Sequence, residues 1–411
     1  MSLSKQSVQS YYMEFLRCAG CSEVFAYENP LHRPITLPVC GHTMCGGCVY
    51  IMRDEKKCPQ DEVSFEINDT SINQLPTNYP LLIIRYDPKQ LPKDNEERYG
   101  DCPSYMKLDD LTRSYFTVTE DFLGEISLFI KPIINDEKRQ SIFSRSTTRK
   151  IFSLLNNQYI NHEGRSKVLE AIRSLGEHIC IDCIRHYQKP QQLKDNLEAA
   201  IRLPKGHFPE PAIQEKVLKT ILLFLKCCHP ITSGENLVES MAQIVQRKDP
   251  YGILSSVHDI VHLLSITPCC FQMVEQADSS SSIKLKPEFQ NYESIRREYD
   301  SRIIEMAMSN DFCLSAEQWS YLFYGNMQHE FEMALIYQKL HTPQSFTTAI
   351  NLFYDMAKHA QGDPQTIEHL RGYFQFLSNI DLEKDASQWY QYTAALGLLK
   401  KVLKLLINLH K

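Results

Sequence analysis

Residues 40–48 read Cys-Gly-His-Thr-Met-Cys-Gly-Gly-Cys, so three cysteines and one histidine fall within nine positions. Two further pairs of similar kind flank this stretch, Cys18 with Cys21 before it and Cys58 with Asp61 after it. A pair spaced by two residues can place both side chains on one ion, and structural zinc takes four soft or borderline ligands in a tetrahedron. Eight such positions in this order predict a module that binds two zinc ions per chain, rather than a run of buried cysteines.

The remaining cysteines do not suggest disulfides. Six of the fourteen lie between Cys18 and Cys58, and the others are scattered or adjacent, as at 227–228 and 269–270. In a reducing compartment clustered cysteines bind metal, and isolated ones act as small apolar side chains. The first ten residues are polar and no apolar run is long enough to cross a bilayer. We therefore expect a cytoplasmic protein without a membrane partner.

The charge of the chain is unevenly distributed. Its net value is −6 over 411 residues, which argues against wholesale nucleic-acid binding. Residues 145–229 carry 14 Lys and Arg against 8 Asp and Glu, a net of +6, whereas residues 230–330 carry 7 against 14, a net of −7. The basic stretch is either a phosphate-facing surface or the solvated side of helices, and the second is the commoner case.

Apolar residues recur at three- and four-residue spacing over most of the chain after residue 104, which predicts a mostly α protein behind the zinc module. The segment 253–273 instead combines a short helical pattern with β-branched residues, and the turn Ser279–Ser282 follows. Helices followed by a hairpin would suit a winged helix. The charged run Pro88–Tyr99 indicates an exposed linker. Helices are expected at 122–130, 149–159, 165–186, 212–225, 288–308, 315–339, 343–360, 364–379 and 387–410.

The ligand order resembles that of the RING finger family, whose two zinc sites interleave along the chain as a cross-brace. Most RING fingers have cysteine at the eighth place, where this sequence has Asp61. A carboxylate is an acceptable zinc ligand, and a bound water is the alternative. The resemblance places the RING-type module at 14–65. It assigns Cys18, Cys21, Cys45 and Cys48 to one zinc ion, and Cys40, His42, Cys58 and Asp61 to the other.

RING modules are associated with ubiquitin transfer. They supply no catalytic residue and hold a ubiquitin-charged conjugating enzyme in a reactive pose. The family's docking groove corresponds here to Gly20, Met52 and Pro59. Met52 and Pro59 fit the family pattern, whereas Gly20 replaces the usual aliphatic residue and Glu62 replaces a basic residue that contacts ubiquitin. The resemblance implies a ligase with a conjugating enzyme and a protein substrate as partners.

Several strings further along resemble the Roquin family of post-transcriptional regulators, in matching order over nearly the whole chain. They are found at 164–166, 173–177, 190–193, 292–298, 316–320, 342–346, 362–364 and 379–381. The resemblance implies a ROQ domain with a winged-helix-like core, flanking HEPN-type helical segments, and binding of stem-loops in messenger RNA. The implied domains are the RING at 14–65, a linker at 66–103, HEPN-like segments at 104–162 and 341–411, and the ROQ core at 163–340.

Two departures from this family are visible. Roquins next carry a Cys-Cys-Cys-His zinc finger, and the chain reaches Lys411 without one, so we expect a fragment or a truncated relative. The winged-helix positions that contact RNA in Roquins fall near 233–235, at Leu254 and near Gln276, and none is basic. Lost phosphate contacts remove sequence-independent affinity, so we expect weakened RNA binding. The remaining candidates for RNA contact are Arg247, Lys248, His262 and Lys284.

Three other patterns are assigned to the helical core. Arg173 and His178 have the spacing of HEPN ribonucleases but fall outside the HEPN-like segments. His178, Cys180, Cys183 and His186 lie on one continuous predicted helix and cannot surround an ion. The apolar stripe of 387–410 favours core packing over a membrane surface.

Two functions remain open. The first is a RING-type ubiquitin ligase whose ROQ-like domain selects the target, either RNA or protein. The alternative is a non-enzymatic repressor that binds RNA stem-loops and whose RING is structural. Gly20 and Glu62 weaken the first, and the missing basic residues weaken the second. We favour the ligase.

Overall fold

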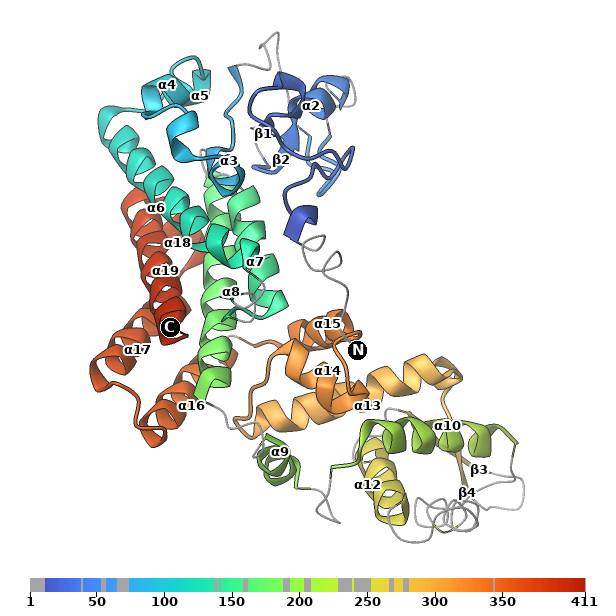
Figure 1. Ribbon diagram of the computed structural model, residues 1–411. Coiled ribbons are helices and arrows are strands. Elements are labelled where there is room, and N and C mark those ends of the chain that lie inside the picture. The colour runs from blue at the N-terminus through green and yellow to red at the C-terminus, as the bar shows by residue number, and fades with distance from the viewer. Residues whose placement is uncertain are drawn as a thin grey trace. The chain divides into compact units, whose positions relative to one another are not determined.

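Figure 1 shows the chain as a computed structural model, which describes residues 12–37, 40–52, 57–64, 74–136, 139, 142–157, 162–187, 193–202, 208–227, 239, 253–265, 270–275, 281–342 and 344–410. The chain forms two compact units, one of Met1–His186 with Ala357–Lys411 and one of Tyr187–Met356. Among the described residues, no helix has the length and apolar character needed to span a membrane. The prediction of a mostly α fold with a small cysteine-rich module near the start is confirmed.

The cysteine-rich module contains little regular structure. Strand β1 (Pro34–Thr36) pairs antiparallel with β2 (Thr43–Cys45), and helix α2 (Gly46–Met52) follows directly. The short helix η1 (Pro30–His32) precedes β1. Its buried apolar side chains other than cysteine include Phe25, Ile35 and Val49, and modules this small usually gain further folding energy from metal binding.

The rest of the first unit is a helical bundle. In it α6, from the first half of the chain, packs along α19, the last helix of the chain (Figure 1). A Cβ added at Gly397 would lie 2.8 Å from Cε2 of Phe122, so glycine is what lets these helices approach. The bundle comprises α3 (Tyr79–Arg85), α4 (Asn95–Tyr99), α5 (Pro103–Met106), α6 (Asp110–Asn135), α7 (Arg145–Asn156), α8 (His162–Tyr187), α17 (Pro364–Ser378), α18 (Leu382–Ala386) and α19 (Trp389–Leu409).

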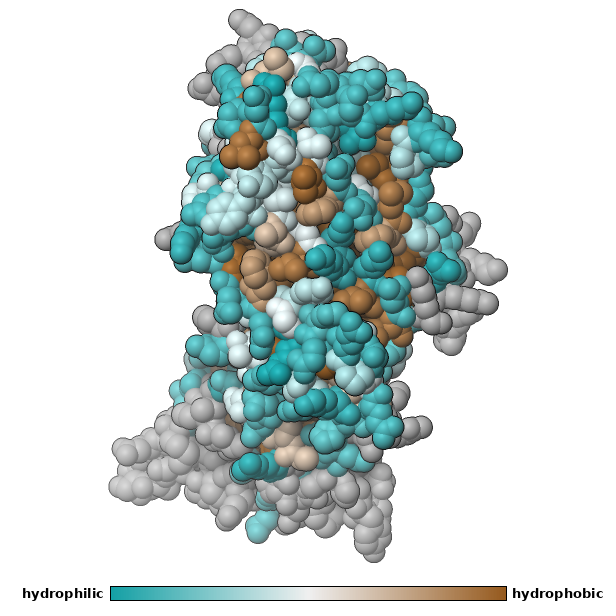
Figure 2. Space-filling model, turned by 90° about the vertical axis from the view of Figure 1, so that its left-hand side faces the viewer, coloured by the Kyte–Doolittle hydropathy of each residue, from teal (hydrophilic) through white to brown (hydrophobic). Residues whose placement is uncertain are grey.

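The apolar stripe of α19 lies in the core of this bundle. Leu396, Leu399, Leu403 and Leu406 are each at most 1% exposed, so the preference for core packing over a membrane surface is confirmed. Figure 2 views the side on which α6 and α17 lie in Figure 1, where hydrophilic side chains break the apolar ones into separate patches.

The prediction of an exposed linker at Pro88–Tyr99 is wrong at Leu91, which is 3% exposed, and at Tyr99. Tyr99, the last residue of α4, is 1% exposed, and its hydroxyl donates to Glu120 at 2.7 Å. Its ring packs edge-on against Tyr79 and Phe116, with centroids 5.6 and 5.1 Å away. The charged residues around Tyr99 led to the prediction of an exposed segment, although the tyrosine itself is buried.

The second unit places a β-hairpin after a helix, in the order that the sequence suggested, but Ser281 and Ser282, which were expected in the turn, begin the second strand of the hairpin. Helix α12 (Ile253–Ser265) is followed by β3 (Phe271–Glu275), which pairs antiparallel with β4 (Ser281–Leu285). The other elements of the second unit are α9 (Leu193–Ile201), α10 (Pro211–Cys227), η6 (Pro287–Phe289), α13 (Tyr292–Ser309), α14 (Ala316–Tyr324), α15 (Glu330–Leu340) and most of α16 (Ser345–His359).

The single helix expected at 315–339 is two helices, α14 and α15. Gly325 ends α14 in the left-handed region, with φ 72°, and its N–H donates to the carbonyl of Tyr321 at 2.9 Å. Glycine adopts this conformation without the penalty that a Cβ brings, so it is the residue that makes the break possible.

Candidate metal centres

Two equivalent turns present the paired ligands. In the first, the N–H of Ser22 donates to the carbonyl of Cys18 at 2.8 Å; in the second, the N–H of Glu62 donates to that of Cys58 at 2.8 Å. Ser22 and Glu62 have φ of 60° and 56°, which reverses the chain after each pair. In both turns the cysteine sulfur accepts a hydrogen bond from the backbone N–H two residues after it. Gly20 donates to Cys18 and Gln60 donates to Cys58, each at 3.4 Å. Such donors stabilise a thiolate.

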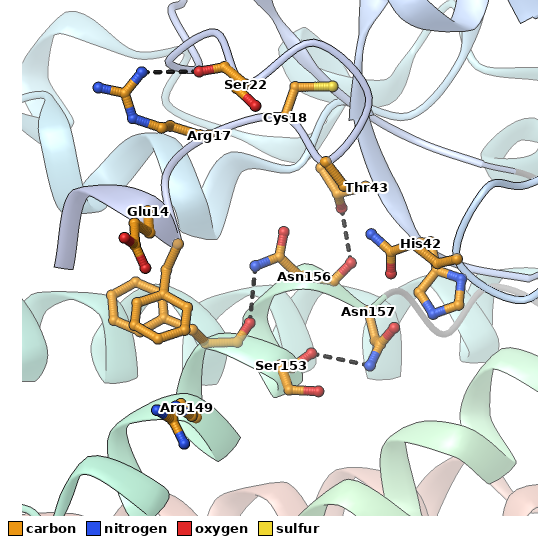
Figure 3. Close-up of a pocket in the computed structure, with 14 residues that line it drawn as sticks. Glu14, Arg17, Cys18, Ser22, His42, Thr43, Arg149, Ser153, Asn156 and Asn157 are labelled. Carbon is orange, nitrogen blue, oxygen red and sulfur yellow. Dashed lines mark hydrogen bonds between the residues drawn. The ribbon is translucent and has the colours of Figure 1, made fainter. Parts of the chain in front are cut away.

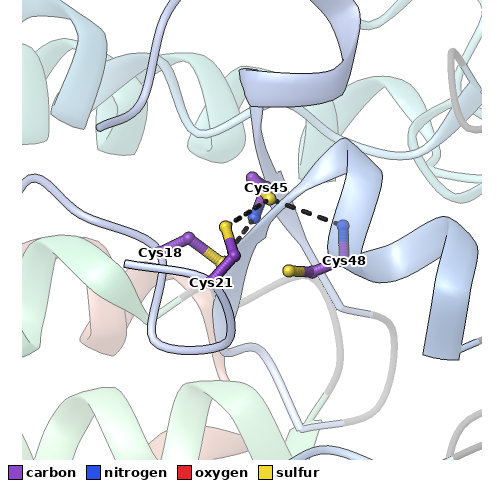
Figure 4. A group of neighbouring side chains, drawn as sticks. All are labelled: Cys18, Cys21, Cys45 and Cys48. Carbon is purple, nitrogen blue, oxygen red and sulfur yellow. Dashed lines mark hydrogen bonds between the residues drawn. The ribbon is translucent and has the colours of Figure 1, made fainter. Parts of the chain in front are cut away.

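The first candidate centre brings together Cys18, Cys21, Cys45 and Cys48, whose sulfurs all lie within 4.8 Å of one another (Figure 4). Cys45 ends β2 and Cys48 lies in the first turn of α2, where the Cys48 N–H donates to the Cys45 sulfur at 3.4 Å. A hydrogen bond from the Cys45 side chain lowers the pKa of Cys18 to about 4, while burial raises the pKa of Cys48 to about 12. Thiols packed this closely cannot all ionise without a cation.

The second candidate centre brings together Cys40, His42, Cys58 and Asp61, again with ligand atoms within 4.8 Å. Nδ1 of His42 lies 3.4 Å from the Cys58 sulfur and 3.4 Å from Oδ2 of Asp61. Burial lowers the pKa of His42, which keeps the imidazole neutral as a metal ligand must be. Burial opposes the ionised form of Asp61, but hydrogen bonds from Lys167 and Cys58 prevail and lower its pKa.

Both groups fit zinc in the chemistry of their donors. One offers four thiolates and the other two thiolates, an imidazole and a carboxylate, sets that structural zinc accepts in a tetrahedron. The structure thus places all eight predicted ligands, Asp61 included, in the two groups that the sequence indicated. Bound there, one ion would link the first turn to β2 and α2, and the other would link the second turn to Cys40 and His42, just before β2.

The predicted docking residues lie at the surface of this module. Gly20 and Pro59 are exposed and Met52 is partly exposed. A Cβ added at Gly20 would lie 3.1 Å from the sulfur of Cys48 and 3.0 Å from Cε of Met44, so an aliphatic side chain here would crowd a candidate zinc ligand. Sequence reasoning missed Ile51, which is 74% exposed beside Met52 on α2. An isoleucine in so short a helix could have been recognised from the sequence as a candidate contact residue.

A cavity of about 430 Å³ lies between the cysteine-rich module and α7 (Figure 3). Arg17, His42 and Thr43 line it from the module, and Arg149 and Asn156 line it from α7. No sequence signal could have revealed it, because even the nearest residues of its two walls, Gln60 and Arg149, lie 89 positions apart in the chain.

The RNA-contact candidates are only partly placed. Arg247 and Lys248 lie outside the described residues. His262 is exposed on α12, with its ring stacked on that of His258 at 6.3 Å. Lys284 is exposed on β4, opposite Gln272 in the hairpin.

The alternative pattern along α8 is structural. Nδ1 of His178 lies 2.8 Å from the carbonyl of Ser174 in the same helix, and Cys180 and Cys183 are each 0% exposed. None of these residues belongs to a metal-type group among the described residues. The assignment to helix core therefore holds for Cys180 and Cys183, whereas His178 is partly exposed and His186 is exposed.

The family model and the similar proteins found by comparison all point to one family. The Roquin II domain model matches residues 287–342. Roquin-2 of Mus musculus is 33% identical over 404 residues, which cover 97% of this chain and 32% of the relative. Roquin-1 of Homo sapiens is 32% identical over 407 residues, covering 97% of this chain and 34% of the relative. The chain thus spans about a third of the length of these relatives.

Proposed function

This chain belongs to the Roquin family, and on that premise we propose that it is a RING-type ubiquitin ligase whose ROQ-like region selects the target. The observation that carries the proposal is the interleaving of two four-ligand groups along residues 18–61. A module of this kind contributes by holding a charged conjugating enzyme in a reactive pose, not by supplying a nucleophile. We further propose a cytoplasmic protein with a conjugating enzyme and a protein substrate as partners, and RNA as a weaker one.

The exposed apolar side chains of the module support a docking role. Ile51 is 74% exposed and Tyr50 is 50% exposed on α2, and Leu31 is 57% exposed in the neighbouring η1. Exposed apolar side chains gathered on one face are typical of surfaces that bind other proteins. With Met52 and Pro59, they would give a conjugating enzyme an apolar surface to bury.

A structural RING in an RNA stem-loop-binding repressor is the second candidate. The observation that favours it is the crowding at Gly20, because the side chain that RING ligases use at this place would meet the Cys48 sulfur at 3.1 Å and require it to shift by a few tenths of an ångström. The docking surface therefore lacks one anchor, worth roughly 2 kcal/mol of apolar burial.

A binding titration separates the two candidates. Ubiquitin-conjugating enzymes from a panel are titrated against the wild-type chain and an Ile51→Glu variant. Phe331→Glu serves as the matched control, since Phe331 is 58% exposed on α15 of the second unit. The ligase proposal expects saturable binding that Ile51→Glu weakens at least tenfold and Phe331→Glu leaves unchanged. Absence of binding by the wild type across the panel would favour the structural RING.

A further inference from the structure

The zinc module is docked on α7 of the helical bundle. The hydroxyl of Thr43 donates to the carbonyl of Asn156 at 2.8 Å (Figure 3). Asn78, the N-cap of α3, donates from Nδ2 to Thr43 Oγ1 at 2.9 Å and to the carbonyl of Leu155 at 2.7 Å. These carbonyls belong to the last turn of α7, where a helix cannot satisfy them itself. The rings of Phe15 and Phe152 stack alongside, with centroids 4.7 Å apart. The module therefore caps a helix.

One further contact joins the helices to a candidate zinc ligand. Nζ of Lys167, in α8, lies 2.7 Å from Oδ2 of Asp61. The same oxygen lies 3.4 Å from Nδ1 of His42, the other non-sulfur ligand of that centre. The oxygen is therefore within reach of both a second candidate ligand and the lysine.

The chemistry of this centre favours such sharing. Two thiolates and a carboxylate leave one uncompensated negative charge beside a divalent ion, and the Lys167 ammonium supplies the matching positive charge. A carboxylate oxygen has two lone pairs, so it can bind a metal and accept a hydrogen bond at once, whereas a cysteine sulfur is only a weak acceptor.

We propose that Asp61 is shared between the second zinc ion and Lys167, so that metal binding at this centre and docking of the module onto α8 are one coupled event. This gives a reason for aspartate at the eighth position, where a cysteine would hold zinc without engaging the bundle. Lys167 acts as a positioning residue. The inference does not depend on ligase activity.

The test uses the zinc-loaded chain and a Lys167→Met variant, which keeps most of the side-chain length and removes the charge. Lys194→Met is the matched control, because Lys194 pairs with Glu210 at the same 2.7 Å with 39% exposure, against 40% for Lys167. Zinc release to a competing chelator and hydrogen exchange of the backbone around 43 and 155–157 are measured. Removing the partner of a metal ligand typically lowers metal affinity 10- to 100-fold.

We expect Lys167→Met to weaken retention of one of the two zinc ions about tenfold and to raise exchange at the docking contacts. Lys167→Arg, which keeps the charge, and Lys194→Met should both leave zinc retention and hydrogen exchange at their wild-type values. Asp61→Cys should retain zinc but show the raised exchange, and adding Lys167→Met to it should have no further effect. Wild-type retention and exchange in Lys167→Met, or additive effects in the double variant, would overturn the proposal.

Discussion

Replacing Arg296 by methionine should strongly destabilise the second unit. The Arg296 side chain on α13 is 1% exposed and donates to the carbonyl of Phe323 at 2.8 Å and to Gln214 at 3.1 Å. Its Nε lies 3.0 Å from Asp300, which also accepts a hydrogen bond from Tyr324 at 2.7 Å. Methionine fills similar space but leaves the Asp300 carboxylate without its cation.

The expected cost is about 3–5 kcal/mol at pH 7.5, the usual range when one partner of a buried ion pair is removed. It should depend on pH. Burial raises the pKa of Asp300 from 3.8 to about 6, although Arg296 opposes this. Protonation of Asp300 contributes its whole share of the free energy of unfolding below pH 4, and this contribution is lost as the pH rises through 6. Without Arg296 the pKa rises further, so the cost at pH 5 should be smaller by at least about 1 kcal/mol.

Urea unfolding followed by tryptophan fluorescence is the assay. The chain has two tryptophans, Trp319 in the second unit and Trp389 in the first, so a Trp389→Phe background reports the second unit alone. Arg302→Met on the same helix is the control, because Arg302 is 23% exposed in its ion pairs and should cost at most about 1 kcal/mol. A cost for Arg296→Met below that of Arg302→Met, or one equal at both pH values, would refute the reasoning.

Three further outcomes are expected. Gly397→Ala should destabilise the first unit by about 1–3 kcal/mol, because the added Cβ would meet the ring of Phe122 at 2.8 Å; Gly372→Ala, with nothing within 4 Å, should be neutral or stabilising in a thermal melt. Elemental analysis should find two zinc ions per chain, and one or none would contradict the two-centre account. Residues 104–411 should bind an RNA stem-loop weakly, and the binding should be lost as the salt concentration rises. In a titration at two salt concentrations, the double variant Leu254→Lys, Gln276→Arg should bind the stem-loop more tightly. Tight binding by the wild type at physiological salt would contradict this.

Local sequence pattern was enough to predict most helices and the eight residues that the structure gathers into two groups able to hold metal. The Cys-x2-Cys and Cys58-x2-Asp61 turns are closed by hydrogen bonds within five residues, so their geometry follows from spacing alone. The break at Gly325 depends on one residue in the left-handed region inside an otherwise continuous apolar pattern, which periodicity does not detect.

The docking of the module onto the bundle could not be predicted in this way. Lys167 is 106 positions from Asp61, and Asn156 is 113 positions from Thr43. Asp61 was singled out as a candidate ligand, but Lys167, Asn156 and Thr43 taken alone are ordinary polar side chains on a helix or a strand. Only the packing of α7 and α8 against the module gives them a partner.

The central claim, that this chain is a RING-type ligase, is tested most directly by the rate at which ubiquitin leaves a thioester-charged conjugating enzyme for free lysine. The wild-type chain should accelerate this discharge with at least one conjugating enzyme of a broad panel, and Cys45→Ser, which removes a ligand of the first centre, should abolish the acceleration. Discharge at the unassisted rate across the panel, by a chain that retains two zinc ions, would contradict the account and leave the RING a structural role.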